Sequence, residues 1–457
     1  MDYKDFIESR SQANTGDGFA PVWMPDFLFD YQQSLVDWSI RTGRAATLAD
    51  CGLGKTPMQL VVAENVVRHT NRPVLVLTPL AVGQQTVKEA EKFGVDARRT
   101  EKITGAAVYV ANYERLHKFN AADFAGVVCD ESSILKNFDG TIKAQVTEFM
   151  RTMRYRFLYT ATAAPNDFVE LGTSSEALGY LGHMDMLNRF FKNDQNTSDT
   201  DRKWAAASGG GPKWRFKGHS EKPFWQWVTS WARALRKPSD LGFSDDRFAL
   251  PELIEREHIV GARKPREGFL FSLPAHGLTE QREERRRTIA ERCERAAALV
   301  SDTGKPAVCW ANLNDEADAM ERLIPGAVQV SGTDTDESKE EKFAAFQSGQ
   351  IRVLVIKPVI GAWGLNWQHC AHTTVFAGYS FEQYYQSIRR FWRFGQTQNV
   401  IVDHVVSDGE TEVLAARKRK AEQAERMFAE LVRYMREGIK VDRSSYGNKK
   451  EEVPSWL

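Results

Sequence analysis

Short apolar runs separated by helix-like stretches recur through the first half of the chain, at residues 45–48, 74–78, 108–111, 127–129 and 157–159. Strands that are apolar along their whole length, rather than at every second position, are typical of a parallel sheet buried on both faces. Parallel strands also need crossover connections, which the intervening helices provide. The pattern therefore predicts an α/β domain built on a doubly wound parallel sheet.

A second series of runs, at residues 307–310, 327–330, 353–356, 373–376 and 400–402, predicts a second domain of the same architecture. We divide the chain into an N-terminal arm, a first domain, a tryptophan-rich insertion, a connector, a second domain, and a C-terminal helix with its tail. The bounds of these six parts are 1–26, 27–180, 181–250, 251–277, 278–410 and 411–457.

Length and composition narrow the class of protein. A chain of 457 residues is longer than one hydrophobic core usually serves. Its 61 basic and 61 acidic residues cancel, so any surface that binds nucleic acid must arise from local arrangement. The five cysteines include no CxxC pair, which argues against structural zinc or a disulfide framework and favours a reducing cytoplasm. We find neither a signal peptide nor the ~18 consecutive apolar residues needed to cross a membrane.

The strongest chemical signal is the glycine-rich stretch at residues 49–56, directly after the first apolar run. Gly52 and Gly54 let the backbone approach an anion, and a helix that begins there presents free N–H groups to phosphate. In such loops the ammonium of Lys55 would reach the outer phosphates, and the hydroxyl of Thr56 would bind Mg²⁺. The strict GxxxxGK[ST] pattern has glycine at the first position, where this chain has alanine, so a plain strand-to-helix turn is the alternative.

Asp130 and Glu131 follow the run at 127–129, at the end of a predicted strand. Ligands of open α/β sheets bind at the carboxyl ends of the strands, so this pair is expected near the phosphate loop. Beside a bound nucleotide, Asp130 is expected to hold the metal, and Glu131 to orient and help deprotonate the attacking water. The alternative is that the pair only caps a helix.

Tryptophans and basic residues gather in and beside the insertion. The helical spacing of Trp227, Trp231 and their apolar neighbours predicts a small satellite core. The interleaved basic residues favour a second interpretation, in which some rings stack on bases while the cations contact phosphates. The tryptophans are Trp204, Trp214, Trp225, Trp227 and Trp231, and the basic residues are Lys213, Arg215, Lys217, Arg233 and Arg236.

The last predicted helix covers residues 412–436, and its apolar face includes Ala424, Met427, Phe428 and Leu431. We expect this face to pack against the second domain. The three consecutive arginines at 285–287 are expected to form a solvated helix face.

Four motifs are informative as a set. Residues 50–56 read DCGLGKT, residues 130–133 read DESS, residues 364–366 read GLN, and residues 386–396 fit the pattern QxxxRxxRxGQ. Together they resemble the motifs of superfamily 2 helicases, and within that superfamily the Swi/Snf-like branch of double-stranded-DNA translocases, in a compact form of the phage or bacterial kind. The branch has DExGLGKT in its loop and DEAH or a relative in its acidic motif, so both serines depart from the family pattern.

The resemblance implies two tandem RecA-like domains that bind ATP and Mg²⁺. The catalytic residues that it implies are Lys55, Asp130, Glu131, Gln386, Arg390 and Arg393. Nucleotide contacts are expected from Gln32, Gly52, Gly54, Lys55, Thr56, Gly364 and Asn366, and metal contacts from Thr56 and Asp130. Nucleic-acid contacts are expected from Thr78, Pro79, Tyr113, Asn312 and Trp363, and coupling from Thr160 and Thr162.

The implied mechanism requires Arg390 and Arg393 of the second domain to reach a nucleotide held by the first, so that domain closure depends on ATP. Surface ion pairs are the alternative role for these arginines. The implied function is DNA-dependent ATP hydrolysis coupled to sequence-independent movement along, or remodelling of, duplex or branched DNA, in the cytoplasm of a bacterium or a phage-infected host. The alternatives are a strand-separating DNA or RNA helicase, and a nucleotide-gated scaffold with weak hydrolysis that binds nucleic acid.

Overall fold

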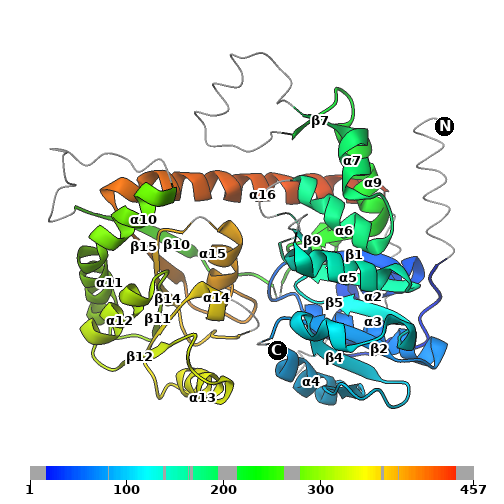
Figure 1. The fold of residues 1–457 in the computed structure, drawn as a ribbon, viewed down its shortest axis with the longest axis horizontal. Coiled ribbons are helices and arrows are strands. Elements are labelled where there is room, and N and C mark those ends of the chain that lie inside the picture. The colour runs from blue at the N-terminus through cyan, green and yellow to red at the C-terminus, as the bar shows by residue number, and fades with distance from the viewer. Residues whose placement is uncertain are drawn as a thin grey trace. The chain divides into compact units, whose positions relative to one another are not determined.

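The computed structural model divides into two compact units (Figure 1). Unit 1 comprises Met1–Asp245 and Ala424–Leu457, and unit 2 comprises Asp246–Gln423. The structure describes residues 17–80, 82–136, 140–162, 164, 168–193, 214–246, 248–261, 278–361, 365–378 and 380–438. No helix in these ranges is long and apolar enough to cross a membrane.

Unit 1 is built on a seven-stranded sheet with the order β3-β4-β2-β5-β6-β1-β9, in which all neighbouring strands are parallel. The predicted runs are strands of this sheet, which confirms the α/β class. The strands are β1 (Arg44–Ala49), β2 (Val74–Thr78), β3 (Ala97–Arg98), β4 (Val108–Asn112), β5 (Gly126–Cys129), β6 (Tyr155–Thr160) and β9 (Ala232–Leu235).

Helices cover both faces of this sheet. Leu75 and Leu77 of β2 belong to a core that also contains side chains of α5, α6 and α9. The alternate residues Val74 and Val76 are fully buried as well and point to the opposite face, where α3 contacts β2, β4, β5 and β6. The helices are α2 (Asp30–Thr42), α3 (Lys55–Thr70), α4 (Gly83–Lys92), α5 (Thr141–Arg151), α6 (Leu171–Leu178), α7 (His183–Phe190) and α9 (Glu221–Trp231). The short 3₁₀ helices are η1 (Tyr113–Lys118), η2 (Ala121–Asp123), η3 (Ser132–Lys136), η4 (Phe168–Glu170) and η6 (Pro238–Leu241).

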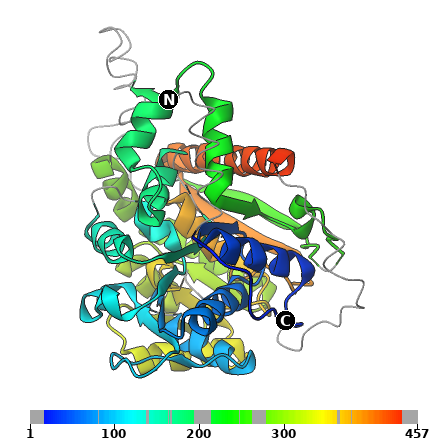
Figure 2. The same ribbon diagram turned by 90° about the vertical axis from the view of Figure 1, so that its right-hand side faces the viewer.

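Residues 17–26, which the sequence assigned to the arm, belong to the folded unit. The side chain of Asn65 on α3 accepts hydrogen bonds from the backbone N–H groups of Val22 and Trp23, both at 2.9 Å. Phe19 stacks on His69, with ring centroids 3.8 Å apart. This segment, coloured dark blue in Figure 2, is therefore fixed to α3, and only residues 1–16 of the predicted arm lie outside the described chain.

The insertion contributes to the core of unit 1 rather than forming a separate satellite. Trp225, Trp227 and Trp231 of α9 are fully buried in the main core, so base stacking is not available to them. The strand β9 then joins the sheet beside β1. A two-stranded antiparallel hairpin precedes α9 and consists of β7 (Phe191–Asn193) and β8 (Trp214–Phe216). Trp204 and Lys213 lie outside the described residues.

Unit 2 contains a six-stranded parallel sheet with the order β10-β15-β14-β11-β13-β12. Its edge strand β10 falls inside the region predicted as a connector, so that prediction was wrong for these residues. The strands are β10 (Leu253–Val260), β11 (Ala307–Trp310), β12 (Ala327–Val330), β13 (Val353–Ile356), β14 (His372–Phe376) and β15 (Val400–Ser407). The helices are α10 (Leu278–Arg287), α11 (Ile289–Thr303), α12 (Asn314–Leu323), α13 (Asp336–Gln347), α14 (Pro358–Gly361) and α15 (Phe381–Ile388), with the 3₁₀ helix η7 (Asp408–Glu410).

The long helix α16 (Thr411–Gly438) contains the boundary between the two units. Its first turn belongs to unit 2, where Val413 packs with Val406. Its apolar face, including Met427 and Phe428, belongs instead to the core of unit 1. The sequence predicted that this face packs against the second domain, and that prediction was wrong.

Candidate active site

The predicted phosphate loop connects β1, which ends at Ala49, to α3, which begins at Lys55. Gly52 and Gly54 have φ angles of 88° and 68°, a backbone region that side chains disfavour. A Cβ atom on Gly54 would also overlap the side-chain nitrogen of Gln32. Both positions therefore favour glycine because of their backbone conformation, and their contact with an anion stays a prediction.

The loop offers positive charge at the start of α3. The N-cap position is Gly54, which has no side chain to cap the helix, so the first-turn N–H groups can serve an anion. The ammonium of Lys55 donates to the carbonyl of Ala49 at 3.0 Å and lies 3.4 Å from that of Asp50. The N–H of Asp50 donates to the backbone carbonyl of Leu235 on β9 at 3.0 Å. The last strand of the insertion therefore holds the start of the loop in place.

Gln32 lies against this loop but is 1% exposed. Its amide nitrogen donates to the carbonyl of Leu53 at 3.1 Å, and its amide oxygen accepts from the N–H of Phe29 at 3.0 Å. The hydroxyl of Tyr31 donates to the same Leu53 carbonyl at 3.0 Å. Gln32 therefore anchors the loop in this structure, and an adenine contact would require it to exchange one of these bonds.

Asp130 and Glu131 lie at the end of β5, separated from β1 in the sheet by β6. The carboxylate of Asp130 accepts a 2.6 Å hydrogen bond from the side chain of Gln59 on α3. Glu131 has φ +47°, and Asn71 is the other non-glycine residue with positive φ in the described part of the chain. Asn71 ends a helix, where this conformation is common, whereas Glu131 carries backbone strain of the kind found at functional sites.

Burial and the neighbouring charge of Glu131 raise the pKa of Asp130 from 3.8 to about 7, against the hydrogen bond from Gln59 and the charge of Lys55. A buried site that disfavours its own negative charge gains from a bound cation. Within the described ranges, no group of three or more His, Cys, Asp or Glu side chains could hold a metal ion. The available donors, the Thr56 hydroxyl and one or two carboxylates, fit Mg²⁺ that is also bound by phosphates.

Tyr113 is 1% exposed, and its hydroxyl donates to the backbone carbonyl of Asp130 at 2.6 Å. Burial raises the pKa of Tyr113 well above its usual value, so the group stays a neutral donor. This placement, inside the protein and against the acidic pair, does not support the nucleic-acid contact predicted for Tyr113.

Thr78 and Pro79 lie at the end of β2. Thr78 is fully buried, and neither its hydroxyl nor the amide oxygen of Asn112 has a hydrogen-bond partner among the described residues. Both atoms lie 3.4 Å from the position that a Cβ on Gly83, the first residue of α4, would occupy. Pro79 is half-buried and Leu80 is 52% exposed, so the surface at this strand end is formed by the residues after Thr78.

Thr160 is the last residue of β6, the strand between β1 and β5, and Thr162 lies two residues after it. The N–H of Thr162 donates to the hydroxyl of Thr160 at 3.0 Å, and both residues are buried. This position, between the two halves of the candidate site, suits the coupling role predicted for them.

In unit 2, the predicted arginine box and the GLN element lie together. The guanidinium of Arg390 donates to the backbone carbonyl of Gln386 at 3.0 Å, to its side chain at 3.1 Å, and to the carbonyl of Leu365 at 3.0 Å. Arg393 reaches the same Leu365 carbonyl at 3.5 Å. Two guanidinium groups therefore converge on one backbone oxygen, next to Asn366.

Asn366 is half-buried, and its side-chain oxygen is buried without a hydrogen-bond partner in the described part of the chain. Gly364 and Trp363, predicted to contact nucleotide and nucleic acid respectively, lie outside the described residues.

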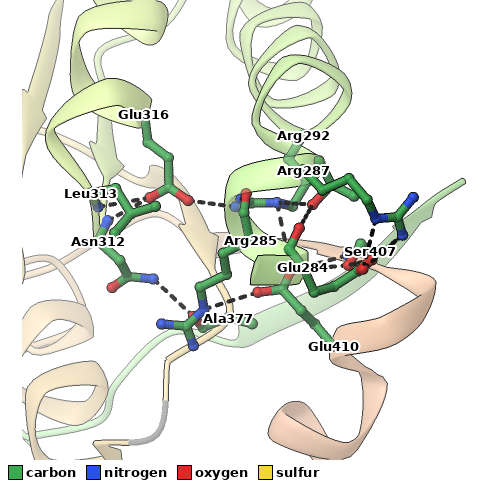
Figure 3. A network of polar contacts seen from close by, with 11 residues as sticks. Glu284, Arg285, Arg287, Arg292, Asn312, Leu313, Glu316, Ala377, Ser407 and Glu410 are labelled. Carbon is green, nitrogen blue, oxygen red and sulfur yellow. Dashed lines mark hydrogen bonds and ion pairs between the residues drawn. The ribbon is translucent and has the colours of Figure 1, made fainter. Parts of the chain in front are cut away.

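Asn312, after β11, is held by a buried ion pair (Figure 3). Its backbone N–H donates to Glu316 at 2.8 Å, and its amide nitrogen donates to the carbonyl of Ala377 at 2.8 Å. Glu316 in turn accepts from Arg292 at 2.7 Å, and neither charged side chain is exposed. The side-chain amide of Asn312 therefore already donates one hydrogen bond within the protein.

The same network includes two of the three arginines that the sequence predicted to be solvated (Figure 3). Arg285 pairs with Glu410 at 3.0 Å, and Arg287 pairs with Glu284 at 2.7 Å. Arg286, between them, is exposed as predicted. The sequence contained one overlooked signal: Arg292 falls on the apolar face of α11, with Cys293 and Ala296, where a charge must find a buried partner.

No family model matches the chain, and no curated protein is similar to it in sequence. A solved structure described as the Sulfolobus solfataricus SWI2/SNF2 ATPase core in complex with dsDNA aligns with a TM-score of 0.42 and 16% identity, over 91% of this chain and 98% of that chain. At this TM-score and sequence identity, the alignment is reported as a similarity and supports no conclusion about the function of this chain.

Proposed function

We propose that the protein is a DNA-dependent ATP hydrolase that moves along, or remodels, duplex or branched DNA without reading its sequence. The observation that carries the proposal is the site in unit 1, where the helix of the phosphate loop is hydrogen-bonded through Gln59 to Asp130, beside the strained Glu131. A glycine loop with a free helix N-terminus favours a polyphosphate, and a buried acidic pair favours its magnesium ion and an attacking water.

Thr56 and Asp130 would hold Mg²⁺, which when bound neutralises charge on the phosphates and orients them. The ammonium of Lys55 exchanges its loop carbonyls for the outer phosphates, because a charged phosphate oxygen is the stronger acceptor. Glu131 accepts the proton of the attacking water and holds that water in line with the bond to be broken.

Arg390 and Arg393 supply positive charge to the transferred phosphoryl group when the units close on ATP. Their shared contact with the Leu365 carbonyl supports this role, because it holds the two guanidinium groups close together. Hydrolysis removes the bond that favours closure, and alternate grip by the two units moves the nucleic acid.

We propose that DNA is contacted at the ends of β2 and β11, through Pro79 and Asn312, and that these contacts are directed to backbone phosphates. Trp363, which lies outside the described residues, stays a sequence-based prediction, whereas the full burial of Thr78 does not support the contact predicted for it. Binding should therefore weaken steeply as salt concentration rises. Steady-state ATP hydrolysis, measured with and without long duplex DNA, tests the proposal. We expect the rate to rise with DNA, and the absence of stimulation by any DNA would overturn it.

Two other functions remain distinguishable. A strand-separating helicase would release a labelled strand from a long blunt duplex, whereas a translocase that moves along intact duplex would not. A nucleotide-gated scaffold is favoured by two departures from the family motifs, the alanine at position 49 and the serines at positions 132 and 133. The hydroxyl groups of both serines are buried and have no hydrogen-bond partner in the described structure. If Glu131→Gln leaves ATP turnover unchanged while DNA binding persists, the scaffold replaces the motor.

A further inference from the structure

Gln59 is a buried polar residue that no sequence motif singled out. It follows Lys55 by four residues on α3, so the two side chains lie on the same face of the helix. It is 1% exposed, within a run of buried apolar residues that includes Met58 and Leu60. Burial of an amide is unfavourable unless its hydrogen bonds are satisfied, so a role in packing alone would favour an apolar residue here.

The amide of Gln59 donates to the Asp130 carboxylate at 2.6 Å. Two further elements fix the backbone of Asp130: its N–H donates to Leu77 of β2 at 2.8 Å, and its carbonyl accepts from Tyr113 of η1 at 2.6 Å. The backbone is thus held by β2 and η1, while the side chain is held by the helix that carries Lys55 and Thr56.

The chemistry of the donor is selective. An arginine or lysine at position 59 would neutralise the carboxylate and compete with a metal ion. An aliphatic residue would leave the carboxylate without this donor. A neutral amide orients the carboxylate and leaves its negative charge available.

We propose that Gln59 is a positioning residue that orients Asp130 for the magnesium ion of the bound nucleotide. This inference rests on the proposed function. Gln59 itself need not touch nucleotide or metal. Because it lies one helical turn after Lys55, it links the cation site to the helix that binds the phosphates.

Cys51 provides a way to measure binding without turnover. It lies in the phosphate loop and is partly exposed, whereas the other four cysteines are buried. A bound nucleotide should cover it, so the rate of its alkylation by a maleimide reports occupancy. The experiment titrates Mg²⁺ at a fixed concentration of a non-hydrolysable ATP analogue and records protection of Cys51 in wild type and in Gln59→Met.

Gln59→Met keeps the length and approximate volume of the side chain and removes the donor. Its matched control is Gln85→Met, which removes an exposed amide that donates to Glu89 at 2.9 Å. We expect Gln59→Met to need about tenfold more Mg²⁺ for half-protection, because hydrogen bonds to charged groups are among the stronger ones. Protection by the analogue without Mg²⁺ should be unchanged, and Gln85→Met should match wild type.

The outcomes separate the two proposals. If Mg²⁺ and analogue fail to protect Cys51 in wild type, the proposed function is overturned, and this inference with it. If they protect wild type and Gln59→Met shows the same Mg²⁺ dependence, only this inference is overturned. A general loss of fold in Gln59→Met would reduce protection with and without Mg²⁺ alike, and would also contradict the inference.

Combining Gln59→Met with Asp130→Asn provides a second check, since a residue that acts through Asp130 should have no further effect on Mg²⁺ dependence once that carboxylate is gone.

Discussion

The two units bury charge in opposite ways. Unit 1 places two carboxylates next to each other, Asp130 and Glu131, each less than a tenth exposed, on a strained backbone. Unit 2 buries Arg292 and three glutamates, which pair with Arg292 and with the half-buried Arg285 and Arg287. Similar sheets therefore carry two adjacent buried carboxylates in one unit and a network of opposite charges in the other. Two like charges buried side by side indicate a place for a bound cation, whereas opposite charges buried as pairs indicate a structural role.

The largest effect that we expect from any substitution in the two sites is that of Glu131→Gln, which removes the proposed general base and keeps the shape of its side chain. We expect kcat for ATP hydrolysis to fall by about 10²–10⁴-fold, the usual contribution of a positioned base. Binding of nucleotide, followed by protection of Cys51, should change little. A variant that hydrolyses ATP at the wild-type rate would show that the strained carboxylate is not catalytic.

Breaking the network in unit 2 should affect stability rather than chemistry. Arg292→Ala leaves Glu316 buried with its partner removed, and we expect the free energy of unfolding to fall by about 3–5 kcal/mol. Urea denaturation measures this loss. Arg286→Ala, on an exposed neighbouring arginine, should change stability by less than about 0.5 kcal/mol. Equal effects of the two substitutions would contradict a structural role for the network.

The opposite result is expected in unit 1, where removing a buried charge should stabilise the fold. Because the pKa of Asp130 is raised from 3.8 to about 7, the folded state holds a proton that the unfolded state has lost between those pH values. The contribution of Asp130 to stability therefore falls as pH rises from about 4 to about 7, and then levels off. Asp130→Asn should be more stable than wild type by about 4 kcal/mol at pH 8, and equally stable near pH 4. Urea denaturation across this pH range checks it, and a constant difference would exclude Asp130 as the titrating group.

Much of the fold follows from local sequence, because buried parallel strands are apolar throughout. The run 74–78 became β2 with the same bounds, and Gly52 and Gly54 adopt the backbone that the loop required. β10 escaped prediction because an edge strand exposes residues such as Arg256 and Glu257, and so lacks a continuous apolar pattern.

The parts of the candidate site that the sequence did not reveal depend on partners far apart along the chain. Gln59 and Tyr113 meet Asp130 from separations of 71 and 17 residues. Arg292 finds Glu316 and Glu410 only once α11, α12 and η7 are folded. The spacing of residues along the chain does not predict contacts between such distant positions. The sequence therefore predicted a nucleic-acid contact for Tyr113 and a solvent-exposed side chain for Arg285.

The central claim is that ATP held in unit 1 is hydrolysed with help from arginines of unit 2. The most direct measurement is single-turnover ATP hydrolysis by Arg393→Ala in the presence of duplex DNA, with nucleotide binding measured on the same protein. Arg322→Ala, on an exposed arginine of α12, is the matched control. We predict that Arg393→Ala binds ATP as wild type does and hydrolyses it about 10³–10⁵-fold more slowly, while Arg322→Ala is unaffected. Hydrolysis by Arg393→Ala at the wild-type rate would contradict the account.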